Sequence, residues 1–372
     1  MSDPAEDASL PPRANPELVG HEAAEAALLA AWNSGRMPHA WLIAGPRGIG
    51  KATLAFRFAR FAMAQGARKS AESGGLFGSA APASPTTLSL PSEHPVFRRI
   101  AAEGHADMLT LRPGMPNPKS SPPNKPSQEI IVYWVRRAVD LLHRTAAEGG
   151  WRVVVVDTAE DMSDEAANAL LKALEEPSPE CLLILVSNAP GRLLPTIRSR
   201  CRTLQLQPLP EATVDGLLQR HRRELTAAER KTLTGLCAGS IGRAIELADS
   251  GGAELYRSLL DLLGGLPRLD VAAAHGFAET MGKRGEDGQS GLRTALDLME
   301  GIVHRLAKTA AGEPSVLPEE AQLAARFAGR GARPWLDAWD RLNRLSSAGD
   351  GLNLDRKSVL LAALGAFERA AT

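Results

Sequence analysis

The sequence predicts an α/β P-loop domain, a parallel sheet covered by helices, followed by a small helical domain and a larger all-helical domain. A glycine-rich loop at 45–52 stands between a short apolar run and a helical pattern, and apolar runs then alternate with helical patterns to about residue 209. After Pro210 no strand-like pattern returns. The predicted domains are 17–209, 210–252 and 253–372, after an acidic, proline-rich tail at 1–16 that we expect to be disordered.

The first domain is predicted from apolar periodicity and from punctuation by Gly, Pro and capping residues. The run Val153–Val156 is continuous and β-branched, which is typical of a parallel strand buried on both faces. Ser163 is suited to cap a helix that stops before Pro177. The predicted elements are helix 22–33, strand 40–44, helix 51–64, strand 108–112, helix 130–147, strand 153–156, a helix after Ser163, and strands 182–186 and 202–206.

Two stretches of this domain predict irregular structure. Residues 66–93 are rich in Gly, Ser, Ala and Pro, and we expect a flexible insertion there. Residues 113–127 are rich in Pro and predict a loop.

Composition excludes several classes of protein. The charges balance, with 43 Lys and Arg against 43 Asp and Glu, so any contact with DNA must be local. The three cysteines form no C-x-x-C pair, which argues against a zinc module and a disulfide framework. No apolar stretch is long enough to cross a bilayer and no signal-peptide pattern is present, so we expect a cytoplasmic protein.

Residues 45–52 match the phosphate-binding template G-x-x-x-x-G-K-[ST] at every position except the last. Gly45, Gly48 and Gly50 would let the backbone wrap around phosphates, and Lys51 would reach the β- and γ-phosphates. The alternative is a glycine-rich turn with an incidental lysine. The flanking strand and helix patterns favour a phosphate loop, and ATP binding stays open.

The last position of the template is Ala52, which lacks the hydroxyl that would bind Mg²⁺. Thr53 follows, but one helical residue turns a side chain by about 100°, so its hydroxyl is expected to point elsewhere. We expect no zinc and no required cofactor, with ATP as an open possibility.

The next strands end in polar residues. Asp157 follows the 153–156 run as the carboxylate of a Walker-B strand would, but Thr158 stands where a catalytic glutamate usually follows, and threonine is no base. Asn188 closes the following strand, where a polar sensor would face the γ-phosphate. Both Asp157 and Asn188 also suit simple strand-end turns. Two losses at one site predict that this chain has no ATPase activity of its own.

Arg200 lies in the tripeptide Ser199-Arg200-Cys201 after the 182–186 strand. Arginine is permanently charged and fork-shaped, which suits it to transition-state phosphate charge. Because Arg198, Arg200 and Arg202 alternate, the polar face of an edge strand is the alternative on pattern alone.

These motifs in combination resemble bacterial clamp-loader subunits of the AAA+ class. The motifs stand in family order: Val19-Gly20-His21, residues 36–40, the P-loop, the string 167–177 (ANALLKALEEP) and Ser199-Arg200-Cys201. The resemblance implies that the first domain is RecA-like, that 210–252 is a lid and that 253–372 is a collar. It also implies that Arg243, in Gly239-Ser240-Ile241-Gly242-Arg243-Ala244, approaches bound nucleotide from the lid, although these residues alone suit a plain helix start.

Within that family, the altered Walker positions Ala52 and Thr158 make the chain resemble the delta-prime subunits of DNA polymerase III. The resemblance implies a non-hydrolysing stator in a ring with gamma/tau and delta subunits, where Arg200 acts in trans as an arginine finger on a neighbour's ATP. The ring loads a sliding clamp on primer-template DNA in the replisome. Many relatives carry a four-cysteine zinc module, whereas residues 66–93 lack cysteine, and His94, His105 and Asp107 cannot rebuild such a site.

Two alternatives stay open. The chain is a self-sufficient AAA+ ATPase of the gamma/tau type if Thr53 or a water replaces the missing hydroxyl. It is a nucleotide-independent scaffold if the P-loop is purely structural.

Overall fold

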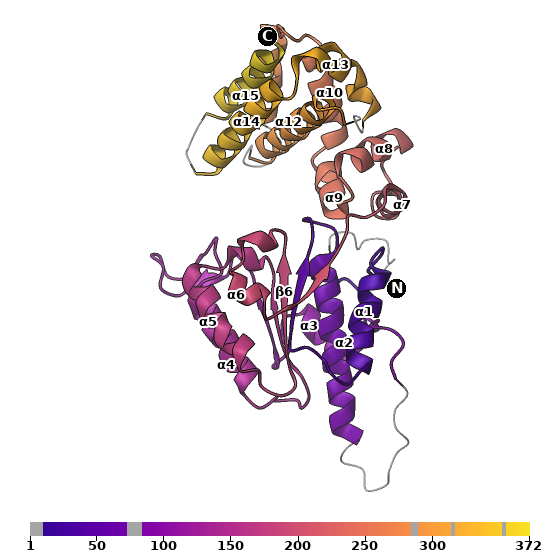
Figure 1. Cartoon of the computed structure of the whole chain (residues 1–372), viewed down its shortest axis with the longest axis vertical. Coiled ribbons are helices and arrows are strands. Elements are labelled where there is room, and N and C mark those ends of the chain that lie inside the picture. The colour runs from indigo at the N-terminus through magenta and orange to yellow at the C-terminus, as the bar shows by residue number, and fades with distance from the viewer. Residues whose placement is uncertain (1–9, 73–83, 284–288, 314–316, 352–354) are drawn as a thin grey trace. The chain divides into compact units, whose positions relative to one another are not determined.

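The computed structural model describes residues 10–72, 84–283, 289–313, 317–351 and 355–372. The chain forms two compact units: residues 1–213 with 239–242, and residues 214–238 with 243–372 (Figure 1). The predicted boundaries at 209 and 252 remain predictions, and each unit is considered by itself. The prediction of a disordered tail at 1–16 is wrong for residues 13–16, because the buried guanidinium of Arg60 donates to the carbonyls of Arg13 and Asn15 at 2.8 Å each.

The first unit is built on a five-stranded sheet in the order β2-β5-β6-β1-β7, in which every paired strand is parallel. Residues of β1, β5 and β6 are buried throughout, as continuous apolar runs require when helices cover both faces. The strands are β1 (Ala40–Ala44), β2 (Met108–Leu111), β5 (Arg152–Val156), β6 (Cys181–Ser187) and β7 (Arg202–Gln205).

Helices cover the two faces of this sheet and confirm the predicted three-layer α/β class. Trp41 and Ile43 of β1 point into a core made with α1, α2 and α3, while Leu42 and Ala44 join the core on the opposite face with α4, α5 and α6. The two helical layers lie on either side of the sheet in Figure 1. The helices are α1 (Glu22–Asn33), α2 (Lys51–Glu72), α3 (Pro95–Ala101), α4 (Val132–His143), α5 (Asp164–Glu175) and α6 (Pro195–Arg198).

Local signals explain several of these boundaries. Ser163 caps α5 by accepting a hydrogen bond from the Ala166 amide at 3.3 Å, as predicted. His94 caps α3 in the same way, through its Nδ1 and the Val96 amide at 3.2 Å, and Pro95 begins that helix.

The structure corrects the predicted flexible insertion at both of its ends. Helix α2 continues to Glu72 instead of ending at Ala64. Leu88 is 1% exposed within the core that α2 helps to form, so the C-terminal end of the predicted insertion is anchored to the domain. Residues 73–83 lie outside the described residues. Composition misled here because one buried leucine and a helical continuation decide the local structure.

Smaller differences occur next to it. The sequence did not predict α3, and the predicted loop 113–127 contains a short antiparallel pair, β3 (Pro116–Asn117) with β4 (Lys125–Pro126).

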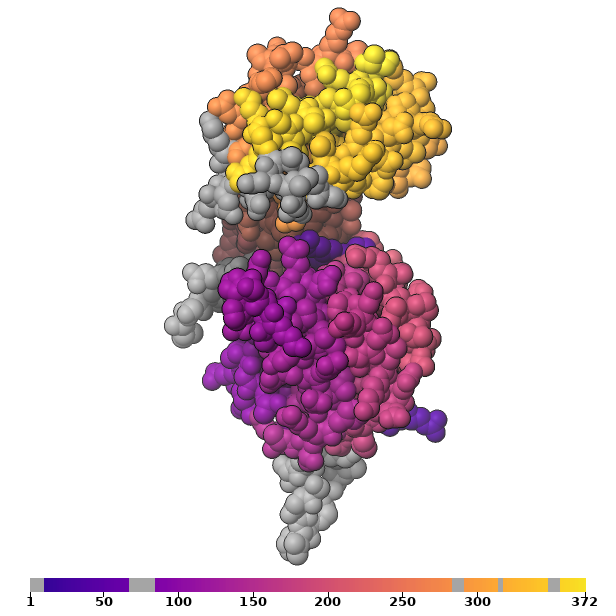
Figure 2. All heavy atoms as spheres, turned by 90° about the vertical axis from the view of Figure 1, so that its left-hand side faces the viewer, coloured from indigo at the N-terminus to yellow at the C-terminus, as the bar shows by residue number. Residues whose placement is uncertain are grey.

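All regular elements among the described residues of the second unit are helical, as predicted. Its α14 packs against α12 and α15, with Trp335 and Phe367 buried. Helices α14 and α15 form the gold and yellow part of this unit in Figure 2. The helices from the boundary onward are α7 (Glu211–His221), α8 (Ala227–Leu236), α9 (Ile241–Asp249), α10 (Gly252–Leu263), α11 (Val271–Lys283), α12 (Gln289–Ala310), α13 (Ala321–Phe327), α14 (Arg333–Gly351) and α15 (Arg356–Ala371).

Throughout the described parts of both units, none of the helices combines the length and the apolar character needed to span a membrane.

Candidate functional site

The loop between β1 and α2 needs its glycines. Gly45, Gly48 and Gly50 have φ angles of 152°, 75° and 103°, which side chains rarely tolerate. A Cβ atom on Gly45 would lie 2.7 Å from the carbonyl oxygen of Leu206, which follows the neighbouring strand β7. The loop therefore has the tight glycine-dependent turn that the motif predicts.

Lys51 is turned inward. The residue is 4% exposed, and its Nζ donates to the carbonyl of Pro46 within the loop and to Oδ1 of Asn188 at 2.8 Å. Burial lowers the pKa of Lys51 to about 8, against the opposing charges of Glu160 and Asp157. The ammonium group that would meet a phosphate is engaged by the protein's own oxygens.

Asn188 is held in place by the carboxylate of Glu160. Its backbone amide and its Nδ2 both donate to Oε1 of Glu160 at 2.9 Å. Burial raises the pKa of Glu160, but its hydrogen bonds, including those from Asn188, outweigh burial and hold the pKa below its usual value. The 3₁₀ turn Ala159–Asp161 brings Glu160 back to the end of β6. The sequence places an acidic residue near the end of β5 but does not indicate that Glu160 will contact Asn188.

Asp157 and Thr158 end β5 beside this group. Burial raises the pKa of Asp157, and the charge of Lys51 opposes this. Thr158 adopts a left-handed conformation, φ 56° and ψ 61°, that strains a β-branched residue, and its hydroxyl donates to the Asp157 carbonyl at 2.7 Å. The structure thus brings Lys51, Asp157 and Asn188 together with Glu160.

Gly242 and His21 both contact the backbone of the phosphate loop. The Gly242 amide donates to the Gly48 carbonyl at 2.9 Å, and a Cβ on Gly242 would lie 3.0 Å from the Gly48 Cα. The His21 ring nitrogen Nε2 lies within hydrogen-bonding distance of the Ile49 carbonyl. The glycine at 242 and the histidine of the Val-Gly-His motif therefore have packing roles at the loop.

Arg200 lies in the turn between α6 and β7, not in a strand. The edge-strand alternative is wrong for Arg200, because β7 begins only at Arg202. Cys201 is 9% exposed and anchors one side of the turn in the core, where burial raises its pKa to about 12. The Ser199 hydroxyl donates to the Thr196 carbonyl at 3.1 Å. The Ser-Arg-Cys motif is a fixed turn that presents its middle residue.

The Arg200 guanidinium is exposed and has a partner in the same chain. Its Nη2 lies 2.8 Å from Oε1 of Glu175, the last residue of α5, and its Nη1 donates to the Thr196 carbonyl at 3.0 Å. The Arg200 side chain is 36% exposed and that of Glu175 is 50% exposed. The sequence contained both residues in separate motifs, but only packing of α5 beside α6 shows that they meet.

Arg243 lies in the second unit, where its Nη2 donates to Oδ2 of Asp297 on α12 at 2.9 Å. Its predicted approach to a nucleotide remains a prediction.

The residues considered for zinc have other contacts. Asp107 is 2% exposed and accepts the amides of Ala147 and Glu148 at 2.7 and 2.9 Å. The His105 Nδ1 accepts the Asp107 amide at 3.3 Å. Within the described residues Cys181, Cys201 and Cys237 are buried and take part in no disulfide.

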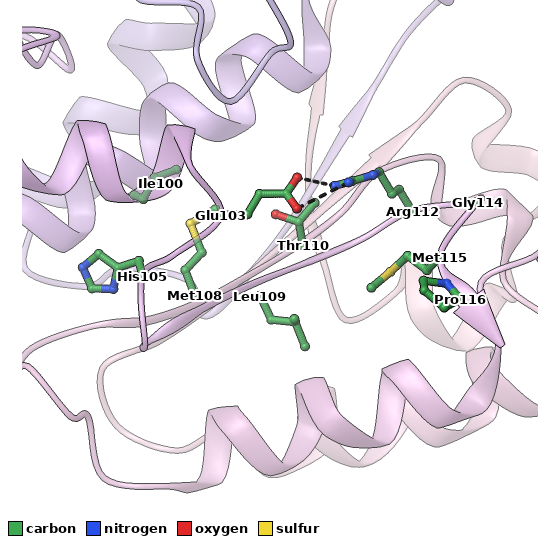
Figure 3. Close-up of a pocket in the computed structure, with 10 residues that line it drawn as sticks. All are labelled: Ile100, Glu103, His105, Met108, Leu109, Thr110, Arg112, Gly114, Met115 and Pro116. Atoms are coloured by element: carbon green, nitrogen blue, oxygen red, sulfur yellow. Dashed lines mark hydrogen bonds and ion pairs between the residues drawn. The ribbon is translucent and has the colours of Figure 1, made fainter. Parts of the chain in front are cut away.

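A hollow of about 230 Å³ lies along β2, which is an edge strand. Figure 3 shows Met108 and Ile100 on one side of the strand and Met115 on the other. An ion pair between Arg112 and Glu103, 2.7 Å, crosses above the strand in the same view. The predicted nucleotide-site residues do not line this hollow.

Comparisons with known proteins agree with these features. A family model described as "DNA polymerase III, delta subunit" matches residues 83–210. The DNA polymerase III subunit delta′ of Pseudomonas aeruginosa is 33% identical over 237 residues, 63% of each chain. The delta′ subunit of Escherichia coli is 33% identical over 222 residues, 59% of this chain and 57% of that one.

A further relative has a different subunit name. The DNA polymerase III subunit gamma/tau of Mycobacterium bovis is 31% identical over 205 residues, 55% of this chain and 30% of that one. The matched part spans less than two thirds of the length of each of these three relatives. Over about 60% of its length the chain is a homologue of the delta′ subunits of bacterial DNA polymerase III.

Proposed function

We propose that this chain is a non-hydrolysing stator of a DNA polymerase III clamp loader. Arg200 would complete the ATP site of an adjacent gamma/tau subunit in trans. The assembled ring would then place a sliding clamp on primed DNA during replication. The chain would belong to the polymerase holoenzyme without catalysing nucleotide transfer itself.

One observation carries this proposal: Lys51 is buried against oxygens of its own chain, whereas Arg200 is exposed at the surface. Lys51 is 4% exposed and bonded to oxygens of its own chain. The Arg200 side chain is 36% exposed on a turn anchored by Cys201. An exposed, anchored arginine is available to a neighbouring subunit, while the inward lysine is not presented to a ligand.

The residues around the P-loop fit Mg²⁺-dependent hydrolysis poorly. Ala52 offers no hydroxyl for the metal, and Thr158 offers no base for the attacking water. A nucleotide phosphate would have to displace Lys51 from both the Pro46 carbonyl and Asn188. We therefore propose that the chain needs no nucleotide or zinc of its own.

The partners proposed from the relatives are gamma/tau and delta subunits, with the sliding clamp and primer-template DNA reached through the complex. Rings of this kind use head-to-tail contacts, so a subunit with only one nucleotide-related face suits the end of an open ring. The proposed compartment is the cytoplasm, at the nucleoid-associated replisome.

The test is steady-state ATPase of the reconstituted loader with clamp and primed DNA. We expect the isolated chain to be inert. Arg200→Ala should reduce hydrolysis by ~10³-fold or more at the one site it completes, so that total turnover falls only in part while the complex still assembles. Arg198→Ala, two residues away and also exposed, is the matched control and should leave turnover unchanged.

ATP hydrolysis by the isolated chain, together with an unchanged Arg200→Ala complex, would overturn the proposal in favour of a self-sufficient ATPase. An inert chain whose Arg200→Ala complex keeps full turnover would instead favour the scaffold alternative.

A further inference from the structure

The second unit contains a hollow of about 390 Å³ between the start of α14 and the end of α15. These helices lie side by side on the face shown in Figure 2. The floor is made of small residues: Ala338, Ala366 and Ala370 are each 1–2% exposed. Because these buried residues are alanines, the space above them is open, whereas larger side chains would fill it.

The walls of this hollow carry three arginines. Arg333 and Arg341 come from α14, where they stand two turns apart, and Arg369 comes from the last turn of α15. Asp337 stands between the first two on the same stripe of α14. The local charge is therefore positive.

These arginines are not neutralised by the protein. Within the described part of the chain, none of the three guanidinium groups makes an ion pair or hydrogen bond. Elsewhere in the same unit arginines pair with carboxylates of their own chain, as in Arg222 with Asp249 at 2.7 Å and Arg305 with Glu320 at 2.6 Å. Among the described residues, the hollow therefore gathers three arginines that have no carboxylate partner, with Asp337 as the one acidic residue of its lining.

Helix α14 adds to this charge. Its N-terminal end is the positive end of the helix dipole, so Arg333 at the first position of α14 is electrostatically unfavourable there. An arginine placed at the positive end of a helix without a carboxylate partner is expected where a bound ligand provides the negative charge. An anion in the hollow would meet all three guanidinium groups and the start of α14.

We propose that this hollow binds a short acidic peptide segment of a protein partner. Arginine forks match carboxylates bidentately, and the alanine floor accepts the methylene stems of Glu side chains. The position of Asp337 favours a peptide over nucleic acid. It would repel an unbroken row of phosphates, whereas a peptide places an uncharged or basic residue opposite it. The site is independent of Arg200, which lies in the other unit.

The test is fluorescence anisotropy with the full chain and a fluorescein-labelled peptide of alternating Glu and Ser, at low ionic strength. Arg369→Gln and Arg333→Gln should each weaken binding, on the order of tenfold. Asp337→Asn should strengthen binding, a change of opposite sign that damage to the fold would not produce. Arg344→Gln, on α14 but outside the hollow, is the matched control and should leave binding unchanged.

Equal binding of the corresponding Gln and Ser peptide would overturn the proposal. So would an Asp337→Asn variant that binds no more tightly than wild type. The same titrations with labelled single-stranded DNA test the rival ligand: if Arg369→Gln abolishes DNA binding and leaves peptide binding intact, the hollow is a nucleic-acid site and the proposal fails.

Discussion

The phosphate loop and the Arg200 turn belong to the same compact unit but handle a basic side chain in opposite ways. Lys51 is buried and its charge is satisfied by Pro46 and Asn188, with Asp157 and Glu160 nearby. Arg200 is exposed and makes one surface ion pair. Removing the partners of a buried charge lowers stability strongly, so the contacts of Lys51 stabilise the loop. An exposed ion pair contributes little to stability, so Arg200 can leave Glu175 to contact a partner at small cost.

Charge reversal at the two positions is expected to give the largest contrast. Lys51→Glu would place a third carboxylate beside Asp157 and Glu160 and should lower the free energy of unfolding by ~3–5 kcal/mol. Arg200→Glu exchanges one exposed charge and should cost no more than about 1 kcal/mol. Urea denaturation of both variants measures the difference, and equal costs would break the comparison.

Glycine substitution should give the next largest contrast. Gly45→Ala would put a Cβ 2.7 Å from the Leu206 carbonyl at a φ of 152° and should cost about 2 kcal/mol or more. Gly191→Ala, in the segment leading to α6, meets nothing within 4 Å and should change stability by less than about 0.5 kcal/mol. Thermal melts of the two variants provide the measurement. A harmless Gly45→Ala would mean that the loop is less tightly held than its contacts indicate.

The buried lysine should also give the loop a pH dependence that Arg200 lacks. Between pH 8 and 10.5 the unfolded chain keeps the Lys51 proton while the folded chain has released it, so stability rises with pH in this window. Lys51→Met lacks this titration. The stability of wild type relative to Lys51→Met should therefore increase from pH 8 to 10.5, as measured by urea denaturation at intermediate values. A constant difference would show that Lys51 titrates normally.

The smallest expected effect concerns the partner of Arg200. Glu175→Gln removes a half-exposed ion pair and should lower stability by about 0.5 kcal/mol or less. Glu176→Gln, one residue along and also exposed, is the control. A loss above about 2 kcal/mol for Glu175→Gln alone would show that Arg200 is fixed as firmly as Lys51 and would remove the contrast.

Sequence patterns were most reliable where local physics decides the structure. The runs in β1, β5 and β6 are apolar without interruption, and such runs form parallel strands covered on both faces. The Ser163 cap and the glycines of the phosphate loop follow from backbone requirements that one residue type meets. Patterns failed at residues 66–93 because composition does not report which leucine will be buried.

The sequence by itself determined the fold class, the phosphate-loop turn and the losses at Ala52 and Thr158, because these depend on residue type at a defined spacing. Only the tertiary structure decided which side chains meet. It brought Glu160 to Asn188, Glu175 to Arg200 and three arginines of α14 and α15 around one hollow. Such meetings depend on how helices and turns pack, and side chains far apart along the chain carry no local signal of their contact.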